Sequence, residues 1–386
     1  MSGEQTRPER PELPSLFQPL GLRGLTLANR IVTAPMCQYS AEEGQANDWH
    51  LIHLGSLALS GAGMLIIEAT AVEARGRITP QCLGLYDDAC EAALARVLQA
   101  IRRYSDIPVA IQLGHAGRKA SVRRPWDGRG AIPIGQGGWP VVGPSALAFD
   151  AESPMPAELD RHGMDGIIEA FVAAARRCGR LGIDAIELHG AHGYLLSSFL
   201  SPLANRRLDA YGGSLENRMR FPLEVFDAVR AVWGDARPLG MRINGSDWHA
   251  DGITPEEAAA FTVQLAVRGC DFVDVSSGGN AEAVVPVGPG YQVPLAARVR
   301  KASGIPTIAV GMIRSVDQAS RILDEGQADL IGLARPMLND PRWPWHAAED
   351  LGIAIEVAPQ LRRGVLRGGA PGHLESLNIA RRHAAA

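Results

Sequence analysis

Short apolar runs alternate with longer stretches of helical periodicity along most of the chain. Residues 87–104, for example, place Ala93, Val97 and Ile101 on one face of a helix. The apolar runs are almost continuous, as expected for strands that are covered on both faces. The predicted strands are residues 30–36, 64–72, 108–113, 185–188, 239–243, 272–276, 307–310 and 330–333. The predicted helices are residues 47–60, 87–104, 164–179, 221–233, 255–267, 293–302 and 315–324.

Eight strand–helix units of this kind predict a single α/β domain, a (β/α)8 barrel of the TIM type. The main competitor is a doubly wound open sheet, which usually carries a glycine-rich phosphate fingerprint after its first strand; here Pro-Met-Cys-Gln-Tyr follows instead. Two long excursions, about 118–161 and 195–220, come after strands 3 and 4 and are expected on the catalytic face. The barrel is predicted over residues 15–363, between a polar N-terminal tail (1–14) and a C-terminal tail (364–386).

Composition and charge narrow the function classes. The net charge of −4 gives no global attraction to nucleic acid or to an anionic membrane. No apolar run approaches the ~20 residues that span a bilayer, and the polar start lacks the apolar core of a signal peptide. The cysteines, at 37, 82, 90, 178 and 270, are odd in number and scattered. They indicate reduced thiols in a cytoplasmic protein, without the spacing of a zinc or iron–sulfur site.

The densest group of chemical side chains follows the fourth predicted strand. His189, His192 and Tyr194 leave the strand end within six residues, on a backbone loosened by Gly190 and Gly193. Neutral or cationic imidazoles can hold a carbonyl or anionic oxygen, and a phenol can deliver a proton beside it. This combination favours an enzyme that reduces or protonates a conjugated carbonyl.

The other strand ends indicate what else the barrel mouth binds. Strands 6, 7 and 8 end in small residues with one arginine: Ser276, Gly279, Gly311, Ala334 and Arg335. Backbone N–H groups beside a guanidinium make a phosphate cradle, and phosphate sites recur at this place in TIM barrels. Gln112 and Arg242 add planar hydrogen-bonding groups. The mouth is therefore predicted to bind a flat, phosphorylated cofactor together with an oxygen-bearing substrate.

At these residues the chain resembles the old yellow enzyme family of FMN-dependent ene-reductases. The nearest match is the bacterial, cysteine-containing subgroup that includes xenobiotic reductases. The resemblance covers about residues 16–363 and is carried by residues 34–39, 112–119, 189–195, 199–207 and 211–218. It implies an FMN-binding barrel in which FMN takes hydride from NADPH or NADH. The flavin would then reduce the activated C=C bond of α,β-unsaturated carbonyl or nitro compounds in the same pocket.

The resemblance also implies roles for single residues. Those near the flavin ring would be Pro35, Met36, Cys37 (which would tune the potential), Ala69, Gln112 and Arg242, the last beside the N1 and O2 atoms. Those holding the ribityl phosphate would be Ser276, Gly279, Gly311, Ala334 and Arg335. Those acting on substrate would be His189 and His192 on the activating oxygen, Tyr194 as proton donor to the α-carbon, and Tyr39 in binding.

Two positions depart from the family pattern. Ala334 stands where a glycine is common, so a methyl group lies close to the expected phosphate. Members of the subgroup often insert an arginine from a neighbouring subunit, which here would be Arg363 in a homodimer or homotetramer; the aromatic residues that often surround that arginine are missing.

Two other function classes stay open from the sequence. His189 and His192 have the His-x-x-His spacing of metal ligands, which would suit a metal-dependent lyase or hydrolase on the same barrel. No acidic cluster or third ligand accompanies them, so no metal is predicted. The second alternative is a non-catalytic binding barrel.

Overall fold

The computed structural model describes residues 13–128, 130–364 and 375–376. Within them, eight parallel strands close into a barrel in the order β10-β11-β12-β3-β4-β5-β8-β9. The ring closes where Ile331 on β12 pairs with Ile31 on β3. The strands are β3 (Ile31–Thr33), β4 (Met64–Ala71), β5 (Val109–Gly114), β8 (Ala185–Gly190), β9 (Leu239–Asn244), β10 (Phe272–Ser276), β11 (Thr307–Ala309) and β12 (Leu330–Leu333). The predicted (β/α)8 barrel is confirmed.

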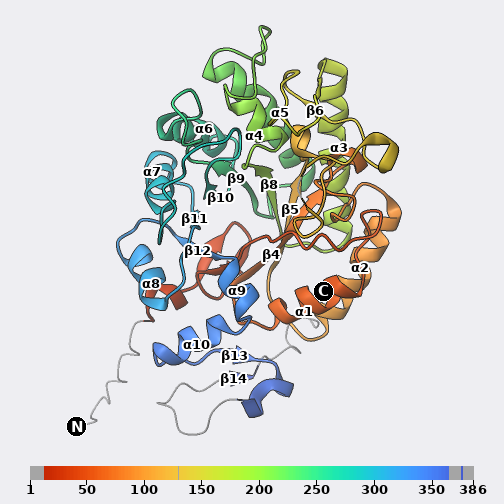
Figure 1. Ribbon diagram of the computed structural model, residues 1–386. Helices are drawn as coiled ribbons and strands as arrows, with labels where there is room; N and C mark the ends of the chain where they lie inside the picture. The colour runs from red at the N-terminus through yellow and green to blue at the C-terminus, as the bar shows by residue number, and fades with distance from the viewer. Residues whose placement is uncertain (1–12, 129, 365–374, 377–386) are drawn as a thin grey trace, which may run out of the picture.

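A ring of helices surrounds the strands (Figure 1). They are α1 (Asp48–Ala58), α2 (Asp88–Arg102), α3 (Arg161–Arg180), α5 (Leu215–Trp233), α6 (Pro255–Ala266), α7 (Val293–Ser303) and α8 (Val316–Asp324). Helix α6 starts where its sequence predicts, because Thr254 accepts from the Glu257 N–H and the Glu257 carboxylate accepts from the Thr254 N–H. The predicted start of α5 at residue 221 is wrong. Ser214 caps the helix seven residues earlier, and Pro222 lies inside it.

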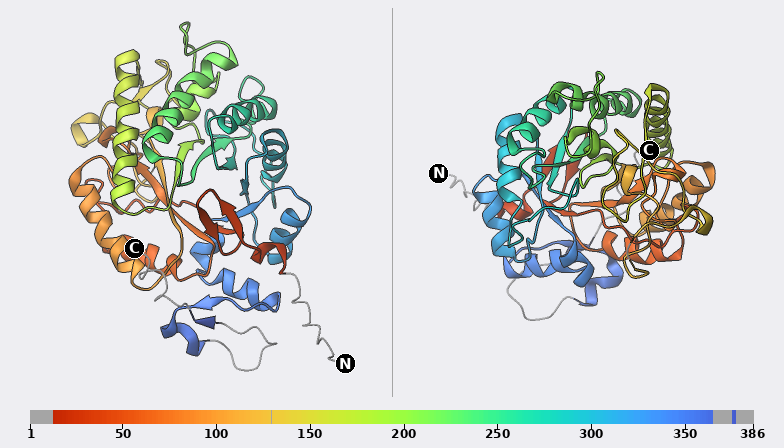
Figure 2. Two further views of the ribbon diagram at one scale, coloured as in Figure 1. Left: turned by 180° about the vertical axis from the view of Figure 1, so that it is seen from behind. Right: turned by 45° about the horizontal axis from the view of Figure 1, so that its top comes forward.

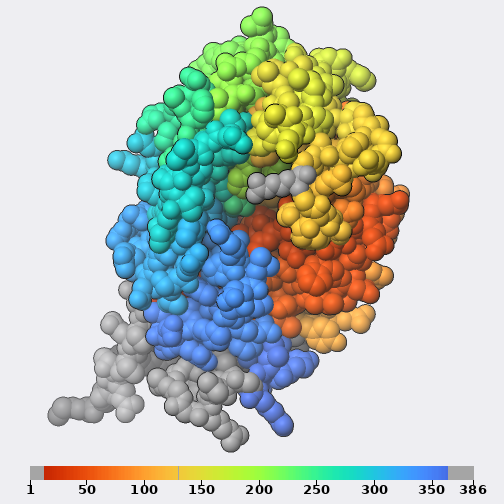
Figure 3. All heavy atoms as spheres, viewed as in Figure 1, coloured from red at the N-terminus to blue at the C-terminus, as the bar shows by residue number. Residues whose placement is uncertain are grey.

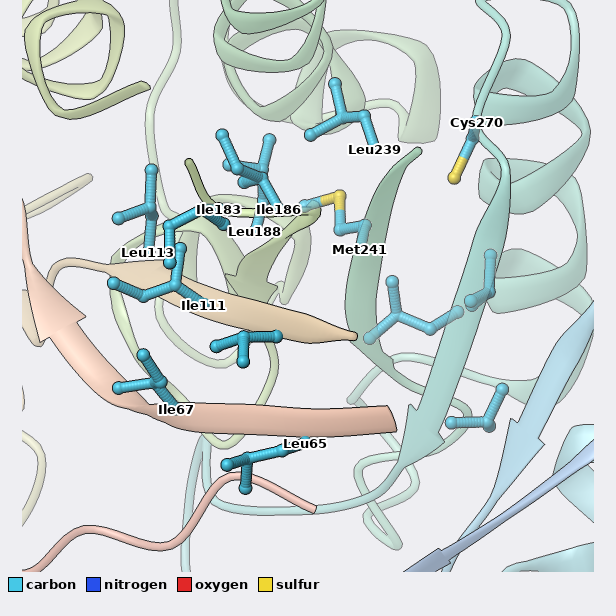
Figure 4. Packing of buried hydrophobic residues seen from close by; sticks show 14 of the residues in the cluster. Leu65, Ile67, Ile111, Leu113, Ile183, Ile186, Leu188, Leu239, Met241 and Cys270 are labelled. Carbon is cyan, nitrogen blue, oxygen red and sulfur yellow. The ribbon is translucent and has the colours of Figure 1, made fainter. Parts of the chain in front are cut away.

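The inward and outward faces of the strands form two separate apolar layers. Outward residues, among them Leu65, Ile111, Leu188 and Met241, pack in the layer between strands and helices (Figure 4). The inward layer contains Val32, Met64, Ile66, Ala110, Ala185, Phe272, Ile308 and Leu330, and the hairpin β1 (Leu20–Leu22) with β2 (Leu25–Leu27) closes it with Leu22 and Leu27. Toward the carboxyl ends of the strands the inward residues become polar. The barrel interior therefore changes there from apolar core to candidate active site.

The excursions after β5 and β8 cover one end of the barrel, as the view with the top brought forward shows (Figure 2). The first contains η3 (Gly117–Lys119), η4 (Ile134–Gln136), β6 (Val142–Gly143) and β7 (Ala157–Glu158), and the second contains the buried helix α4 (Leu195–Leu200). The face drawn in Figure 3 is hollowed near its centre, between the yellow first excursion and the cyan loops after β10. This hollow is the mouth of the barrel.

The C-terminal part of the described chain leaves β12 at Arg335, and its second helix packs the buried Ala347 and Ala348 into the main core. It contains α9 (Arg335–Asn339), α10 (Trp343–Asp350), β13 (Glu356–Val357), η5 (Pro359–Gly364) and β14 (Glu375–Ser376). The elements from α10 onward lie along the lower edge of Figure 1. No helix of the described residues is both long enough and apolar enough to cross a bilayer.

Candidate active site

A cavity of about 320 Å³ opens at the mouth, where the ends of β3, β9, β10, β11 and β12 meet. Seven of the predicted site residues line it: Pro35, His192, Arg242, Ser276, Gly311, Ala334 and Arg335. The lining also includes Ser277, Tyr291, Gln292, Met312 and Arg314, which the sequence did not single out. Gly311 has a φ of +111°, and a Cβ there would lie 2.9 Å from the Gln292 amide nitrogen. A side chain at 311 would therefore intrude on the cavity wall.

Gly279 is not among the residues that line this cavity. It packs against the histidine loop, where its φ is +91° and a Cβ would lie 2.5 Å from the His192 carbonyl oxygen. Its own carbonyl accepts a hydrogen bond from Lys119 Nζ at 3.0 Å. The structure therefore places Gly279 with the predicted substrate residues, while its predicted contact with phosphate stays a prediction.

The two imidazoles and the phenol form one edge-to-face cluster. The ring centroids lie 5.2 Å apart for His189 and His192, and 4.8 Å apart for His189 and Tyr194. The Nδ1 of His189 accepts from the Ala191 N–H at 3.3 Å, so the proton of the neutral ring is on Nε2. Burial and the positive charges of Arg242 and Lys119 lower the pKa of both histidines. Both are therefore neutral hydrogen-bond donors at neutral pH.

Tyr194 keeps its proton over the whole physiological range. Burial raises the pKa of its phenol, and the neighbouring groups Cys37 and Tyr39 raise it further. The Lys119 ammonium lies 5.6 Å from the centre of the Tyr194 ring. A buried, protonated phenol beside two N–H donors can give a proton to a carbon next to a bound carbonyl.

The backbone of His192 is held from two sides. His192 has a left-handed φ of +60°. Its N–H donates to Asn244 Oδ1 at 3.0 Å, and its carbonyl accepts from Lys119 Nζ at 2.8 Å. Asn244 donates in turn to Asp247 and to the Gly278 carbonyl, at 3.0 and 2.7 Å. No role in the site was predicted for Lys119 or Asn244, although each ends or follows a strand at the mouth.

The loop after β3 carries Cys37 and Tyr39 into the same region. The Gln38 N–H donates to Glu68 Oε2 at 2.8 Å, which ties the loop to β4. Burial raises the pKa of both the Cys37 thiol and the Tyr39 phenol. The Tyr39 ring meets the ring of Trp126, from the first excursion, edge to face at 5.9 Å.

The structure also locates Met36 and Ala69, two residues predicted to lie near the flavin ring. Met36 is partly buried against the main core. Ala69 lines a small cavity with Cys82, His189 and Tyr194. The phenol of Tyr194 and the imidazole of His189 therefore share this cavity with residues of β4 and of the loop after it.

Arg242 and Gln112 lie on the floor of the mouth. Arg242 Nε and Nη2 donate to Ser276 Oγ at 2.9 and 2.7 Å, and Nε lies 3.4 Å from Asp274 Oδ2. Gln112 Nε2 donates to Glu187 Oε1 at 2.6 Å. The floor thus offers a fixed cation and an amide to a planar ligand above it.

These residues fit FMN. The mouth cavity runs from Arg242 and His192 to the small-residue wall at Gly311, Ala334 and Arg335. The Arg242 guanidinium suits the edge of the flavin ring that gains negative charge on reduction. The backbone of Gly311 beside Arg335 suits a phosphate. A barrel with these groups at the carboxyl ends of its strands is typical of a flavin-dependent oxidoreductase.

Comparison with known proteins identifies the family. The model of the NADH:flavin oxidoreductase / NADH oxidase family matches residues 15–353. An NADPH dehydrogenase of Geobacillus thermodenitrificans is 44% identical over 351 residues, which are 90% of this chain and 98% of that protein. Among solved structures, morphinone reductase in complex with tetrahydroNAD is 29% identical with a TM-score of 0.73, covering 88% of this chain and 92% of that one. An old yellow enzyme homologue from Zymomonas mobilis is 25% identical with a TM-score of 0.74, covering 87% and 93%.

The chain belongs to the NADH:flavin oxidoreductase / NADH oxidase family. The predicted resemblance to the old yellow enzymes is confirmed. The protein is an NAD(P)H-dependent flavin oxidoreductase, with FMN as cofactor and a nicotinamide nucleotide as reductant. Among the described residues, no three His, Cys, Asp or Glu side chains converge as metal ligands would.

Arg363 does not line the mouth cavity of its own chain. It is exposed on η5, outside the ring of helices. Its predicted role in the site of a neighbouring subunit stays a prediction.

Proposed function

We propose that this enzyme reduces the activated C=C bond of α,β-unsaturated carbonyl or nitro compounds with hydride from NADPH or NADH. The observation that carries the proposal is the cluster of two neutral imidazoles and a protonated phenol beside the mouth cavity. Neutral imidazole donors suit the oxygen of an uncharged carbonyl or nitro group. The phenol of Tyr194 is suited to donate the proton that the α-carbon of the substrate must gain.

Each residue of the cluster has one task. His189, through Nε2–H, and His192 donate hydrogen bonds to the substrate oxygen, which draws electron density away from the β-carbon. Bound FMN supplies the hydride. Tyr194 donates its proton to the α-carbon and regains a proton from solvent. Arg242 compensates the negative charge that collects at the pyrimidine edge of the reduced cofactor.

The remaining predicted residues shape the two ligand sites. Pro35, Met36, Cys37, Ala69 and Gln112 would contact the flavin ring, and Cys37 would tune its potential. Ser276, Gly279, Gly311, Ala334 and Arg335 would hold the phosphate, and Tyr39 would close the substrate side with Trp126. We also propose membership of the cysteine-containing xenobiotic-reductase-like subgroup, a cytoplasmic location, and a homodimer or homotetramer in which Arg363 enters the partner's site.

The proposal is tested by separating the two half-reactions. The purified protein with excess FMN is reduced anaerobically by NADPH or NADH, and the reduced protein is mixed with cyclohexenone, maleimide or a nitroalkene. We expect bleaching of the flavin absorbance in the first step and its recovery, with formation of the saturated product, in the second. Reduction without reoxidation by any of these compounds would contradict the proposed substrate class.

A further inference from the structure

Two fully buried acids lie in the barrel beneath the mouth. Glu187 on β8 and Asp274 on β10 are 0% and 1% exposed. Each lies two residues before a residue of the site, namely His189 on β8 and Ser276 on β10. The two strands flank β9, on which the register partner of Glu187 is Gly240, a residue without a side chain. Nothing in the proposed function uses these acids.

Each acid contacts one of the two polar side chains on the floor of the mouth. Glu187 Oε1 accepts the Gln112 amide at 2.6 Å. Asp274 Oδ2 lies 3.4 Å from Arg242 Nε, whose hydrogen bond goes to Ser276 instead. Among the described residues, Glu187 Oε2 and both carboxylate oxygens of Asp274 have no hydrogen-bond partner. Three buried acceptor atoms are thus left without a donor.

The charges of this layer do not balance if both acids are ionised. The groups that act on the pair are Gln112 from β5 and Arg242 from β9, and only Arg242 brings a positive charge. Two carboxylates against one guanidinium would leave one buried negative charge uncompensated, which is strongly destabilising. Burial raises the pKa of both acids, and the charge of Asp274 raises that of Glu187 further. A proton on one carboxyl supplies the missing donor and removes the excess charge.

We propose that Glu187 and Asp274 hold one proton between them and act as positioning residues for the flavin. The pair orients Gln112 and Arg242 toward the pyrimidine edge and keeps the layer beneath the flavin electrically neutral. The role toward the flavin rests on the proposed contacts of Gln112 and Arg242, whereas the shared proton rests on the protein's own groups alone.

The pair couples proton uptake to flavin reduction. Hydride from NAD(P)H would bring two electrons and one proton, so the bound FMN would gain one negative charge, which Arg242 would have to compensate together with that of the pair. At a pH where the pair has lost its proton with oxidised FMN, reduction raises its proton affinity, and one further proton enters from solvent. The midpoint potential of the bound FMN should therefore depend on pH more steeply than one proton per two electrons allows, from the pair's pKa with oxidised FMN up to its higher pKa with reduced FMN.

Infrared spectroscopy tests the shared proton directly. At neutral pH the wild-type protein should show the carbonyl stretch of a protonated buried carboxyl group, and Glu187→Gln and Asp274→Asn should each lose it. The matched control is Glu91→Gln. Arg177 and Arg180 bind Glu91 at 2.6 and 2.7 Å and lower its pKa, so it is ionised and its loss should leave the band unchanged. A wild-type spectrum without the band, or a band that survives both substitutions, would overturn the proposal.

A redox titration of the holoenzyme tests the coupling. In Glu187→Gln the amide replaces the protonated carboxyl, so we expect FMN to bind and its potential to change with pH by one proton per two electrons throughout. If the midpoint potential of the wild type changes with pH in parallel with that of Glu187→Gln at every pH, the coupling is rejected. A protein that keeps the infrared band but fails to reduce enones would reject the proposed function and leave the proton pair standing.

Discussion

The backbone N–H of His192 donates a 3.0 Å hydrogen bond to the side-chain oxygen of Asn244, at the end of the neighbouring strand. His192 has a φ of +60°, a conformation that costs a residue other than glycine about 1–3 kcal/mol unless its surroundings hold it. Asn244 is itself fixed by its bonds to Asp247 and the Gly278 carbonyl. The position of the imidazole is thus set by β9 as much as by its own loop.

Replacing Asn244 by alanine should loosen this imidazole. The loss of a buried hydrogen bond costs about 1–3 kcal/mol, so we expect the affinity for a phenol ligand to fall about 5- to 150-fold. The measurement is the charge-transfer absorbance of phenol with bound FMN. The control is Ser198→Ala, which removes a buried hydroxyl that donates to the Leu195 carbonyl within α4 and should keep wild-type affinity. Equal affinities in both variants would contradict the role of Asn244.

Lys119→Met should change how stability depends on pH. Burial lowers the pKa of Lys119 from 10.5 to about 8, although its ammonium donates to the carbonyls of His192 and Gly279. Between these two values the unfolded chain binds more protons than the folded protein, so stability rises with pH in this window. Relative to Lys119→Met, the wild-type protein should therefore gain stability from pH 8 to pH 10. Urea unfolding of both proteins at the two pH values measures this, and a constant difference would contradict it.

The double substitution His189→Ala/His192→Ala should abolish phenol binding and enone turnover while the barrel still folds. It should also reduce sensitivity to acid. The pKa of both histidines is lowered in the folded state, so the unfolded chain takes up protons first as the pH falls below about 6.5. Stability is lost in that direction, and the double variant should lose less of it. Phenol titration and urea unfolding at pH 7 and pH 5 check the two outcomes.

Tyr194→Phe should separate the half-reactions. Without the phenol proton we expect reoxidation of the reduced protein by an enone to slow about 10²- to 10⁴-fold, because that is the usual contribution of a positioned acid. Reduction by NADPH needs no such proton and should change far less. Stopped-flow absorbance measures both steps, and the exposed Tyr104→Phe is the control. If the substitution leaves both rates at the wild-type value, Tyr194 is not the donor.

The strands and the histidine–tyrosine cluster could be predicted because their signals are local. Strands that are covered on both faces read as continuous apolar runs, and the cluster lies within six residues of one loop. The start of α5 could not be predicted in the same way, because Pro222 resembles a helix start whereas the true cap, Ser214, is one serine among many.

Contacts between distant loops left no local signal. Lys119 lies 73 residues from His192, and Asn244 lies 52 residues from it. Glu187 and Gln112, 75 residues apart, meet only because β5 and β8 are neighbours in the closed barrel. Each of these side chains looks like an ordinary polar residue at a strand end or inside an apolar strand, and only the register of the barrel shows its partner.

Cys37→Ala should shift the midpoint potential of the bound FMN. Burial raises the pKa of the Cys37 thiol, so at neutral pH it presents a neutral, polarisable S–H in the loop that faces the cavity. The control is Cys178→Ala, since Cys178 is fully buried in α3 within the main core and also keeps its proton. The control should lose stability through its cavity and leave the potential unchanged. Redox titration of the three proteins decides the matter: equal potentials for the wild type and Cys37→Ala would assign Cys37 to packing alone.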